Sequence, residues 1–444
     1  MQISKNKKYQ FLFFFILSIY IIFNGGNSNL AIQFNFILVG SFYLFCLNDK
    51  NYHTHQKNFY NINKHSIIIY LLFLLFLIFQ IIPLPEYSLK IFSPEKYRLI
   101  NLIGNISNSS ISLSPSDSFF QILNFISLLL IVLICKMIFY NERHKYRIFI
   151  YFSFVGFVSS ILAVILYLYG NPDILIYKNS YYKNASTGFF INRTVFSIFL
   201  LFCLISCFEL LKHYEINPKS KRRDYFFLKI YIRLFVIFIT IGIITSFSRI
   251  GNFLLLVTIL FYFLNEVLFS KEKNNSFILI ILLIIFFDLL ILGIYFGSSQ
   301  IVDRFYFLKE DIYGISTGID SMSRFDIAKF GLKEFKNFIF FGYGMGSFEY
   351  IFQLKFINQS NLFANHAHSD IIEFFGELGL VGVFLLFLST IKFFVLKKNY
   401  NLVNYLIFTY LITILLFDFS IHIPLIQILF IIFFIINKKS YGSS

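Results

Sequence analysis

The chain has 444 residues, of which 57% are hydrophobic and 14% charged. Soluble domains carry about a quarter charged residues, so this composition excludes an ordinary soluble domain. The formal net charge is +15, but the basic residues lie in short segments between apolar runs, which indicates membrane topology rather than a nucleic-acid-binding surface.

Residues 1–8 are basic and lead into an apolar segment without a cleavage site, so we expect a retained first span. Further apolar runs follow, each long enough for a hydrocarbon core about 30 Å thick. We therefore predict an all-α polytopic membrane protein with about twelve transmembrane helices. The expected spans are residues 10–23, 30–47, 66–83, 118–139, 148–169, 189–211, 229–247, 251–269, 276–297, 378–396, 402–417 and 422–437. The cysteines lie inside these runs and form neither a metal-ligand pattern nor a loop disulfide framework: Cys46, Cys135, Cys203 and Cys207.

Lysine and arginine collect in alternate short loops, which orients the chain by the positive-inside rule. These expected cytoplasmic residues are Lys50, Lys57, Lys64, Arg143, Lys145, Arg147, Lys219, Lys221, Arg222, Arg223, Lys271, Lys273, Lys397, Lys398, Lys438 and Lys439. The opposite loops, 24–29 and 418–421, contain none. Both termini are therefore expected in the cytoplasm.

Three longer segments are expected on the outer side. Residues 84–117 are predicted to be an interfacial piece, residues 170–188 are rich in Tyr and Asn, and residues 298–377 form one large loop. Within that loop, residues 323–338 alternate apolar and basic positions at helical spacing, which predicts an amphipathic helix on the membrane surface or the bundle. Residues 343–346 form a glycine-rich turn, which is weak evidence for a phosphate loop.

The segment 365–382 is the most polar cluster beside an apolar run. It contains two histidines and three carboxylates: His366, His368, Asp370, Glu373 and Glu377. Asp370 with Glu373 predicts a capping box that opens a helix. His368 would lie just outside that helix, whose positive end favours anions and a neutral, basic imidazole. The alternative is a polar loop that caps a membrane helix.

Arg193, Arg249 and Arg324 all lie on the predicted outer face, against the positive-inside bias. The planar guanidinium binds phosphate oxygens in pairs and stays charged at physiological pH. As a set beside His368, the arginines favour an anion pocket. Individually, each could extend to lipid headgroups or pair with a nearby aspartate: Asp303, Asp320 or Asp370.

Four segments resemble, in order, motifs of the O-antigen ligase/O-antigen polymerase superfamily of bacterial envelope glycosyltransferases. Residues 188–193 (G-F-F-I-N-R) resemble its G-x-F-x-N-R segment, and 248–251 (S-R-I-G) resemble its S-R-G-type turn. Arg324 followed by 338–348 is similar to its R-x(n)-P-x-x-G-x-G-x-F run, and 366–382 is similar to A-H-N-D…E-x-G-x-x-G. The resemblance covers roughly residues 185–385. Departures are Thr194 and Ser369, where the family often has Asn, and the absence of a proline before Gly342.

The resemblance implies a GT-C-like glycosyltransferase in the bacterial inner membrane, with its active site on the periplasmic face. It implies an inverting, metal-independent and cofactor-free transfer. The donor would be a glycan on undecaprenyl pyrophosphate, and the acceptor hydroxyl would belong to lipid A-core, another glycan or a protein. By the same resemblance, His368 is the base or positions the acceptor, and Arg249 and Arg324 bind the pyrophosphate.

Elementary chemistry agrees with these roles, because a sugar hydroxyl needs a positioned base and two arginines can stabilise a departing pyrophosphate. Further candidates for donor or acceptor binding are Arg193, His366, Asp370 and Glu377. We read His366 as a neighbour of the acidic residues, and Glu377 as orienting the loop or capping the tenth span. His53 and His55 are read as solvated loop residues, so no metal-ligand set is expected.

We expect N-terminal spans in residues 1–184, a ligase-like core in 185–385 that includes the periplasmic loop 298–377, and C-terminal spans in 386–444. Within the glycosyltransferase hypothesis, ligase, repeat-unit polymerase and protein O-oligosaccharyltransferase stay open. The donor sugar, chain-length control and oligomeric state also stay open. A transporter or flippase of a lipid-linked glycan is the non-enzyme alternative. It would need charged residues through the bundle interior, whereas Lys136 and Asp288 are the exceptions in nearly charge-free spans.

Overall fold

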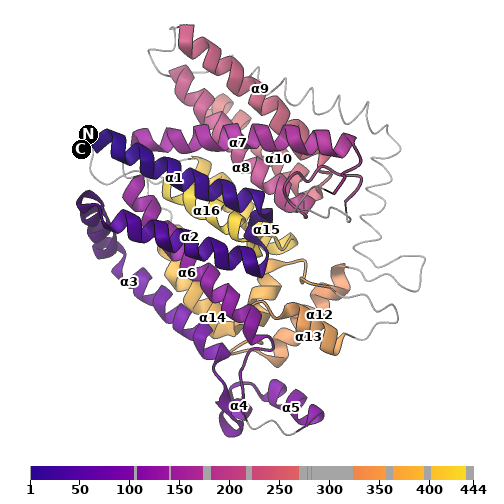
Figure 1. The fold of residues 1–444 in the computed structure, drawn as a ribbon. Helices are drawn as coiled ribbons and strands as arrows, with labels where there is room; N and C mark the ends of the chain where they lie inside the picture. Colours follow the sequence, from indigo (N-terminus) through magenta and orange to yellow (C-terminus); the bar gives the residue numbers. More distant parts are fainter. Residues whose placement is uncertain are drawn as a thin grey trace.

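The protein is described by a computed structural model, in which residues 2–104, 108–139, 142–173, 182–216, 223–269, 324–356, 364–394 and 402–436, with isolated positions 278 and 282, are described. The long helices of these ranges are α1 (Gln2–Ile22), α2 (Asn29–Leu47), α3 (Lys50–Ile81), α6 (Pro115–Ile138), α7 (Glu142–Leu168), α8 (Arg193–Ile216), α9 (Arg223–Thr245), α10 (Arg249–Leu264), α14 (Asp370–Phe394), α15 (Leu402–Phe417) and α16 (Pro424–Ile436) (Figure 1). Every expected span except the ninth coincides with one of them. The ninth, residues 276–297, lies almost wholly outside the described residues.

Eight helices in the described part of the chain are long and apolar enough to cross a membrane: α2, α3, α6, α7, α8, α9, α10 and α14. The shorter helices α15 and α16 are also apolar. The chain is therefore a polytopic helical membrane protein, as predicted. The figure of about twelve crossings stays a prediction.

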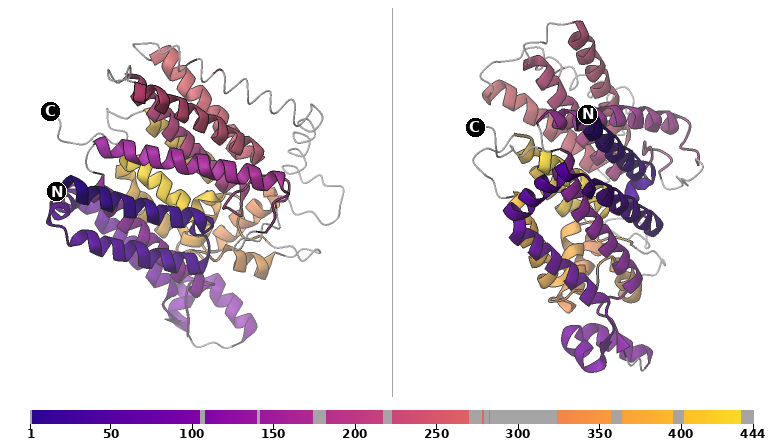
Figure 2. Two further views of the ribbon diagram at one scale, coloured as in Figure 1. Left: turned by 45° about the horizontal axis from the view of Figure 1, so that its top comes forward. Right: turned by 60° about the vertical axis from the view of Figure 1, so that its left-hand side comes forward.

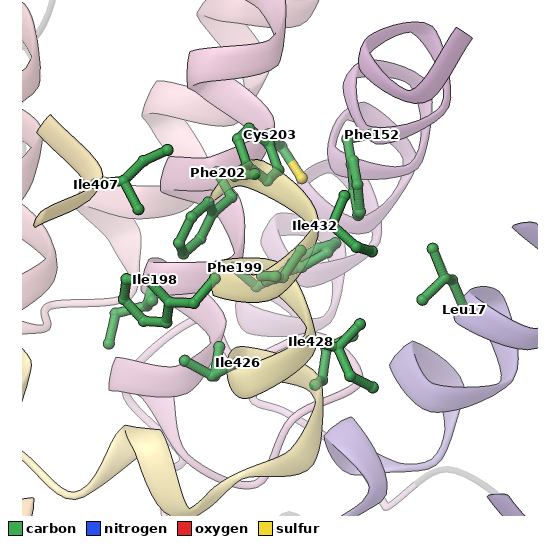
Figure 3. Close-up of a cluster of buried hydrophobic side chains, with 14 of the residues drawn as sticks. Leu17, Phe152, Ile198, Phe199, Phe202, Cys203, Ile407, Ile426, Ile428 and Ile432 are labelled. Carbon is green, nitrogen blue, oxygen red and sulfur yellow. The ribbon is translucent and has the colours of Figure 1, made fainter. Parts of the chain in front are cut away.

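Helix α8 forms the centre of the core. In its apolar membrane-spanning stretch, 89% of the residues are buried inside the protein. The reason is that α7, α9, α10 and α16 pack around it (Figure 2). Figure 3 shows Phe199, Phe202 and Cys203 of α8 among side chains of the surrounding helices. The four cysteines are buried and free, as expected.

One expectation about helix boundaries was wrong. Helix α3 begins at Lys50, so the segment with His53 and His55 is helical and not a loop. Helix α14 begins at Asp370, where the sequence predicted that a helix opens, and continues through the expected tenth span. The carboxylates of Asp370, Glu373 and Glu377 therefore belong to the first turns of a helix.

The outer segments form small elements beside the bundle. A two-stranded antiparallel sheet, β1 (Leu84–Pro85) with β2 (Asn108–Ser109), frames helices α4 (Glu86–Phe92) and α5 (Pro94–Ile103), which lie apart from the bundle at the bottom of Figure 1. The predicted amphipathic helix is α12 (Arg324–Asn337), followed by α13 (Phe348–Lys355). The buried residues of α12 are Ile327, Phe330, Gly331 and Glu334, and they face α14 and α13, whereas Phe325 and Leu332 of the predicted apolar face are exposed. Three short segments complete the described part: η1 (Asn24–Gly26), η3 (Asn265–Phe269, a π-helical extension of α10) and η4 (Ser420–His422).

The loops assigned to the outer side meet at one end of the bundle. The Ile191 amide donates to Asn24 Oδ1 (2.9 Å), and a Cβ atom added to Gly25 would lie 2.7 Å from Ile423. The Ser248 hydroxyl donates to Thr194 Oγ1 (3.2 Å). We call this the arginine end, defined by residues 23–29, 188–194, 246–249 and 418–423. The opposite end joins segments assigned to the other side, for example by a hydrogen bond between Arg147 and Gln10.

Candidate functional site

Two helices at the arginine end begin with the same kind of N-terminal cap. Asn192 Oδ1 accepts from the Thr194 amide (2.7 Å), and Ser248 Oγ accepts from the Gly251 amide (3.1 Å). Each cap is followed at once by an arginine, so Arg193 is the first residue of α8 and Arg249 the first residue of α10. A helix N-terminus carries partial positive charge, which disfavours a cation unless an anion is also bound.

Arg193 and Arg249 are neighbours, since the hydrogen bond from Ser248 to Thr194 joins the starts of their helices. Arg193 is half-buried and its guanidinium lies 5.2 Å from the centre of the Tyr182 ring. Arg249 is exposed. The sequence prediction that these two cations share one region is therefore consistent with the fold.

The segment after α15 lies at about the same height along the helix axes as Arg249. Helices α10 and α15 meet at a hydrogen bond between Thr258 and Tyr410. With a rise of about 1.5 Å per residue, Arg249 lies ~13 Å along α10 from this contact, and Asp418 lies ~12 Å along α15. The charge of Arg324 acts on the Asp418 carboxyl, so the start of α12 lies near the segment after α15.

The carboxylate of Asp370 does not cap α14, so the predicted capping box is wrong. It accepts from the Ile421 amide (2.9 Å) and pairs with Nδ1 of His422. The Asp370 amide in turn donates to the Asp418 carbonyl (2.8 Å). The start of α14 is thereby joined to η4, far away in the sequence.

Three carboxylates one turn or two turns apart on α14 surround His422. Its Nε2 lies 3.5 Å from Glu373 Oε1 and 3.7 Å from Glu377 Oε2, and its ring stacks on Phe374 with ring centres 4.4 Å apart. All three carboxylates and His422 are buried. Sequence reasoning missed His422 because it was assigned to the last span. The available signal was an ionisable pair, Asp418 and His422, between two apolar runs.

His366 and His368 both contact Phe419, with different ring geometries. The His366 ring stacks on the face of Phe419 (4.5 Å), and its Nδ1 lies 2.8 Å from Glu373 Oε1. The His368 ring meets the edge of Phe419 (5.5 Å) and is half-buried, with a left-handed backbone (φ 56°). His366 therefore belongs to the acidic residues, as read from the sequence, whereas His368 stands outside them.

The surroundings shift the proton equilibria of this region. Burial lowers the pKa of His366 and of His422, but the nearby carboxylates, Glu373 first, outweigh it and raise both. Burial raises the pKa of Asp418 to about 6, against the lowering effects of the Ser420 hydroxyl and the Arg324 charge. His422 thus lies between carboxylates that favour positive charge at this position.

A break in α14 explains the glycine-rich turn. Gly379 has φ 64° and ψ −176°, which interrupts the helix. The Leu380 amide donates to the Ile339 carbonyl (2.7 Å), and the Gly344 amide donates to the Glu377 carbonyl (3.1 Å). The turn therefore satisfies the free backbone groups of a broken membrane helix, which lipid could not do. It also orients Glu377, whose Oε1 accepts from the Phe348 amide (3.1 Å).

One group of side chains could hold a metal ion, although no metal-ligand set was expected. His366, Glu373 and His422 offer ligand atoms that all lie within 4.8 Å of one another. The three come from a loop, a helix and a second loop, so no sequence spacing could have revealed them.

A family model described as O-antigen ligase matches residues 234–387. This range contains Arg249, Arg324, His366, His368 and the whole of the break in α14. No curated protein matches the chain. Proteins of this family typically act as glycosyltransferases on lipid-linked glycans. Together with the helical bundle and the motifs described above, the match supports a relationship of this chain to the O-antigen ligase/O-antigen polymerase superfamily.

Proposed function

We propose that the protein transfers a glycan from undecaprenyl pyrophosphate to an acceptor hydroxyl, at the arginine end and on the periplasmic face of the inner membrane. The observation that carries the proposal is convergence. Arg193 and Arg249 open helices whose starts are joined by the hydrogen bond from Ser248 to Thr194, and the charge of Arg324 acts on Asp418, the neighbour of Phe419, which His368 contacts. Helix N-termini and arginine guanidinium groups both favour phosphate oxygens, which suits a pyrophosphate.

In the proposed reaction His368 accepts the proton of the acceptor hydroxyl as its oxygen attacks the anomeric carbon. The bond from that carbon to the pyrophosphate oxygen breaks, with inversion. Arg249 and Arg324 stabilise the charge that develops on the leaving group, so this step needs no metal ion. The half-buried position of His368 at the edge of Phe419 supports this assignment, because it leaves the ring accessible while His366 is held by Glu373.

The test is transfer by purified protein from an undecaprenyl-pyrophosphate glycan to lipid A-core, a glycan repeat or a protein acceptor, each supplied separately. We expect His368→Ala to lower transfer by at least 10²-fold, the low end of what a positioned base contributes. His65→Ala is the matched control, since His65 is exposed on α3. Undiminished transfer by well-folded His368→Ala would overturn the mechanism. Transport of the lipid without transfer to any acceptor would favour a flippase instead.

A further inference from the structure

The ligand atoms of His366, Glu373 and His422 lie within 4.8 Å of one another, and Glu377 Oε2 lies beside His422 Nε2. The separations are 2.8 Å from His366 to Glu373, 3.5 Å from Glu373 to His422, and 3.7 Å from His422 to Glu377. Ligand atoms about 2.0–2.1 Å from a tetrahedral zinc ion lie about 3.3 Å apart, close to these values.

The remaining polar atoms of three of these side chains are already fixed by other groups. His422 Nδ1 pairs with Asp370, Glu373 Oε2 accepts from the Ala367 amide (2.8 Å), and Glu377 Oε1 accepts from the Phe348 amide (3.1 Å). A carboxylate on the far nitrogen of a histidine is typical of metal ligands, because it fixes the ring and leaves the other nitrogen lone pair free.

The atoms that point inward lack hydrogen bonds. His422 Nε2, Glu377 Oε2 and the Tyr343 hydroxyl have no hydrogen-bond partner among the described residues, although all three side chains are more than nine-tenths buried. An orphaned buried polar atom costs about 1–3 kcal/mol, and more if charged. His422 Nε2 and Glu377 Oε2 lie 3.7 Å apart, and two such atoms in one place point to something that binds there.

We propose that His366, Glu373 and His422 bind one zinc ion. Two imidazoles and a carboxylate are a donor set that suits zinc, and its charge compensates buried carboxylates that lipid cannot solvate. Glu377 Oε2 lies 3.7 Å from His422 Nε2, at the border of this group. The ion joins the His366 loop, α14 and η4, and so fixes the backbone from which His368 projects, beyond the transfer chemistry proposed above.

The test is the metal content of the full-length protein, purified in detergent without chelator. We expect about one zinc per chain, because one group of ligand atoms converges among the described residues. Content should fall to the buffer background in His422→Ala and in the near-isosteric Glu373→Gln. The matched controls His368→Ala and His213→Ala should keep it. Zinc added to chelator-treated protein should raise the thermal midpoint of the wild type but not that of Glu373→Gln.

A wild-type protein with background metal content and no zinc-dependent rise in thermal midpoint would overturn the site, and a proton on His422 would then supply the positive charge. The two proposals fail separately. Metal-free protein whose transfer depends on His368 overturns only the ion. Zinc-loaded protein whose His368→Ala variant still transfers glycan overturns only the catalytic role.

Discussion

His368 adopts a left-handed backbone that costs a non-glycine residue roughly 1 kcal/mol or more. The cost is sustained because the chain on both sides is fixed. The Ala367 amide is bound by Glu373, and Asp370 is held by both Asp418 and His422. Such strain commonly accompanies functional positions, where the direction of one side chain matters more than local stability. At the residue scale, the buried carboxylates of Asp370 and Glu373 fix the backbone from which the half-buried His368 projects.

Arg249→Lys should lower transfer by roughly 10- to 100-fold, since hydrogen bonds to charged groups are worth about 1.5–3 kcal/mol and an ammonium cannot contact two phosphate oxygens at once. The measurement is initial rate with saturating acceptor. Arg98→Lys is the control, because the Arg98 side chain is 69% exposed and pairs only with Glu95 among the ion pairs of the described residues. Equal rates for Arg249→Lys and wild type would exclude two-oxygen contact by Arg249.

At the scale of elements, the family's two glycine motifs form one structural unit. The turn at residues 342–346 fills the break in α14 around Gly379, and Gln80 Nε2 of α3 donates to the carbonyls of Phe341 (2.7 Å) and Glu377 (2.9 Å). The break satisfies its backbone groups within the protein, so α14 can change direction while keeping Glu377 buried beside His422.

Gly379→Ala should destabilise the protein by about 2 kcal/mol or more, since the conformation of Gly379 is one that residues with a Cβ rarely adopt. The added Cβ would also lie 2.5 Å from backbone atoms of Phe340 and Gly342. The measurement is thermal unfolding in detergent. Gly40→Ala is the matched control, because a Cβ there meets nothing within 4 Å and an alanine in a helix gains about 0.5–1 kcal/mol. Similar midpoints for the two variants would contradict this role of the break.

For the whole molecule, the bundle has two ends of different character. The loops with few basic residues join at the arginine end, and segments rich in lysine and arginine join at the opposite end. The proposed reaction needs the arginine end to face the periplasm, since Arg193 and Arg249 lie there and Asp370 is joined to its segment 418–423.

Cysteines placed at 249 and 368 should both react with an impermeant thiol reagent added from outside. A cysteine in place of Lys57, which is exposed near the start of α3, should react only after permeabilisation. The native cysteines are buried and give a low background. Labelling of 249 and 368 from opposite sides would abolish the shared site.

Much of this molecule follows from hydropathy and charge alone. Apolar runs predict helices because lipid leaves the backbone no other partners, and the positions of lysine and arginine predict which loops belong together. The motifs also identified Arg193, Arg249, Arg324 and His368, because cations and imidazoles are conspicuous in an apolar chain. The helix start at Asp370 was predicted correctly, but the capping box was wrong, because local patterns do not reveal that the Asp370 side chain has a distant partner.

Only the tertiary structure decided which side chains contact the buried carboxylates of α14. His422 lies beyond the end of α15, whereas Asp370 begins α14, and the sequence assigned His422 to an apolar span. The packing of α14 against η4 places His422 among three carboxylates. The sequence by itself determined a polytopic helical membrane protein with a cationic, histidine-bearing end. Buried charges are stabilised by partners that only the fold brings near, so their pairing could not be read from the order of residues.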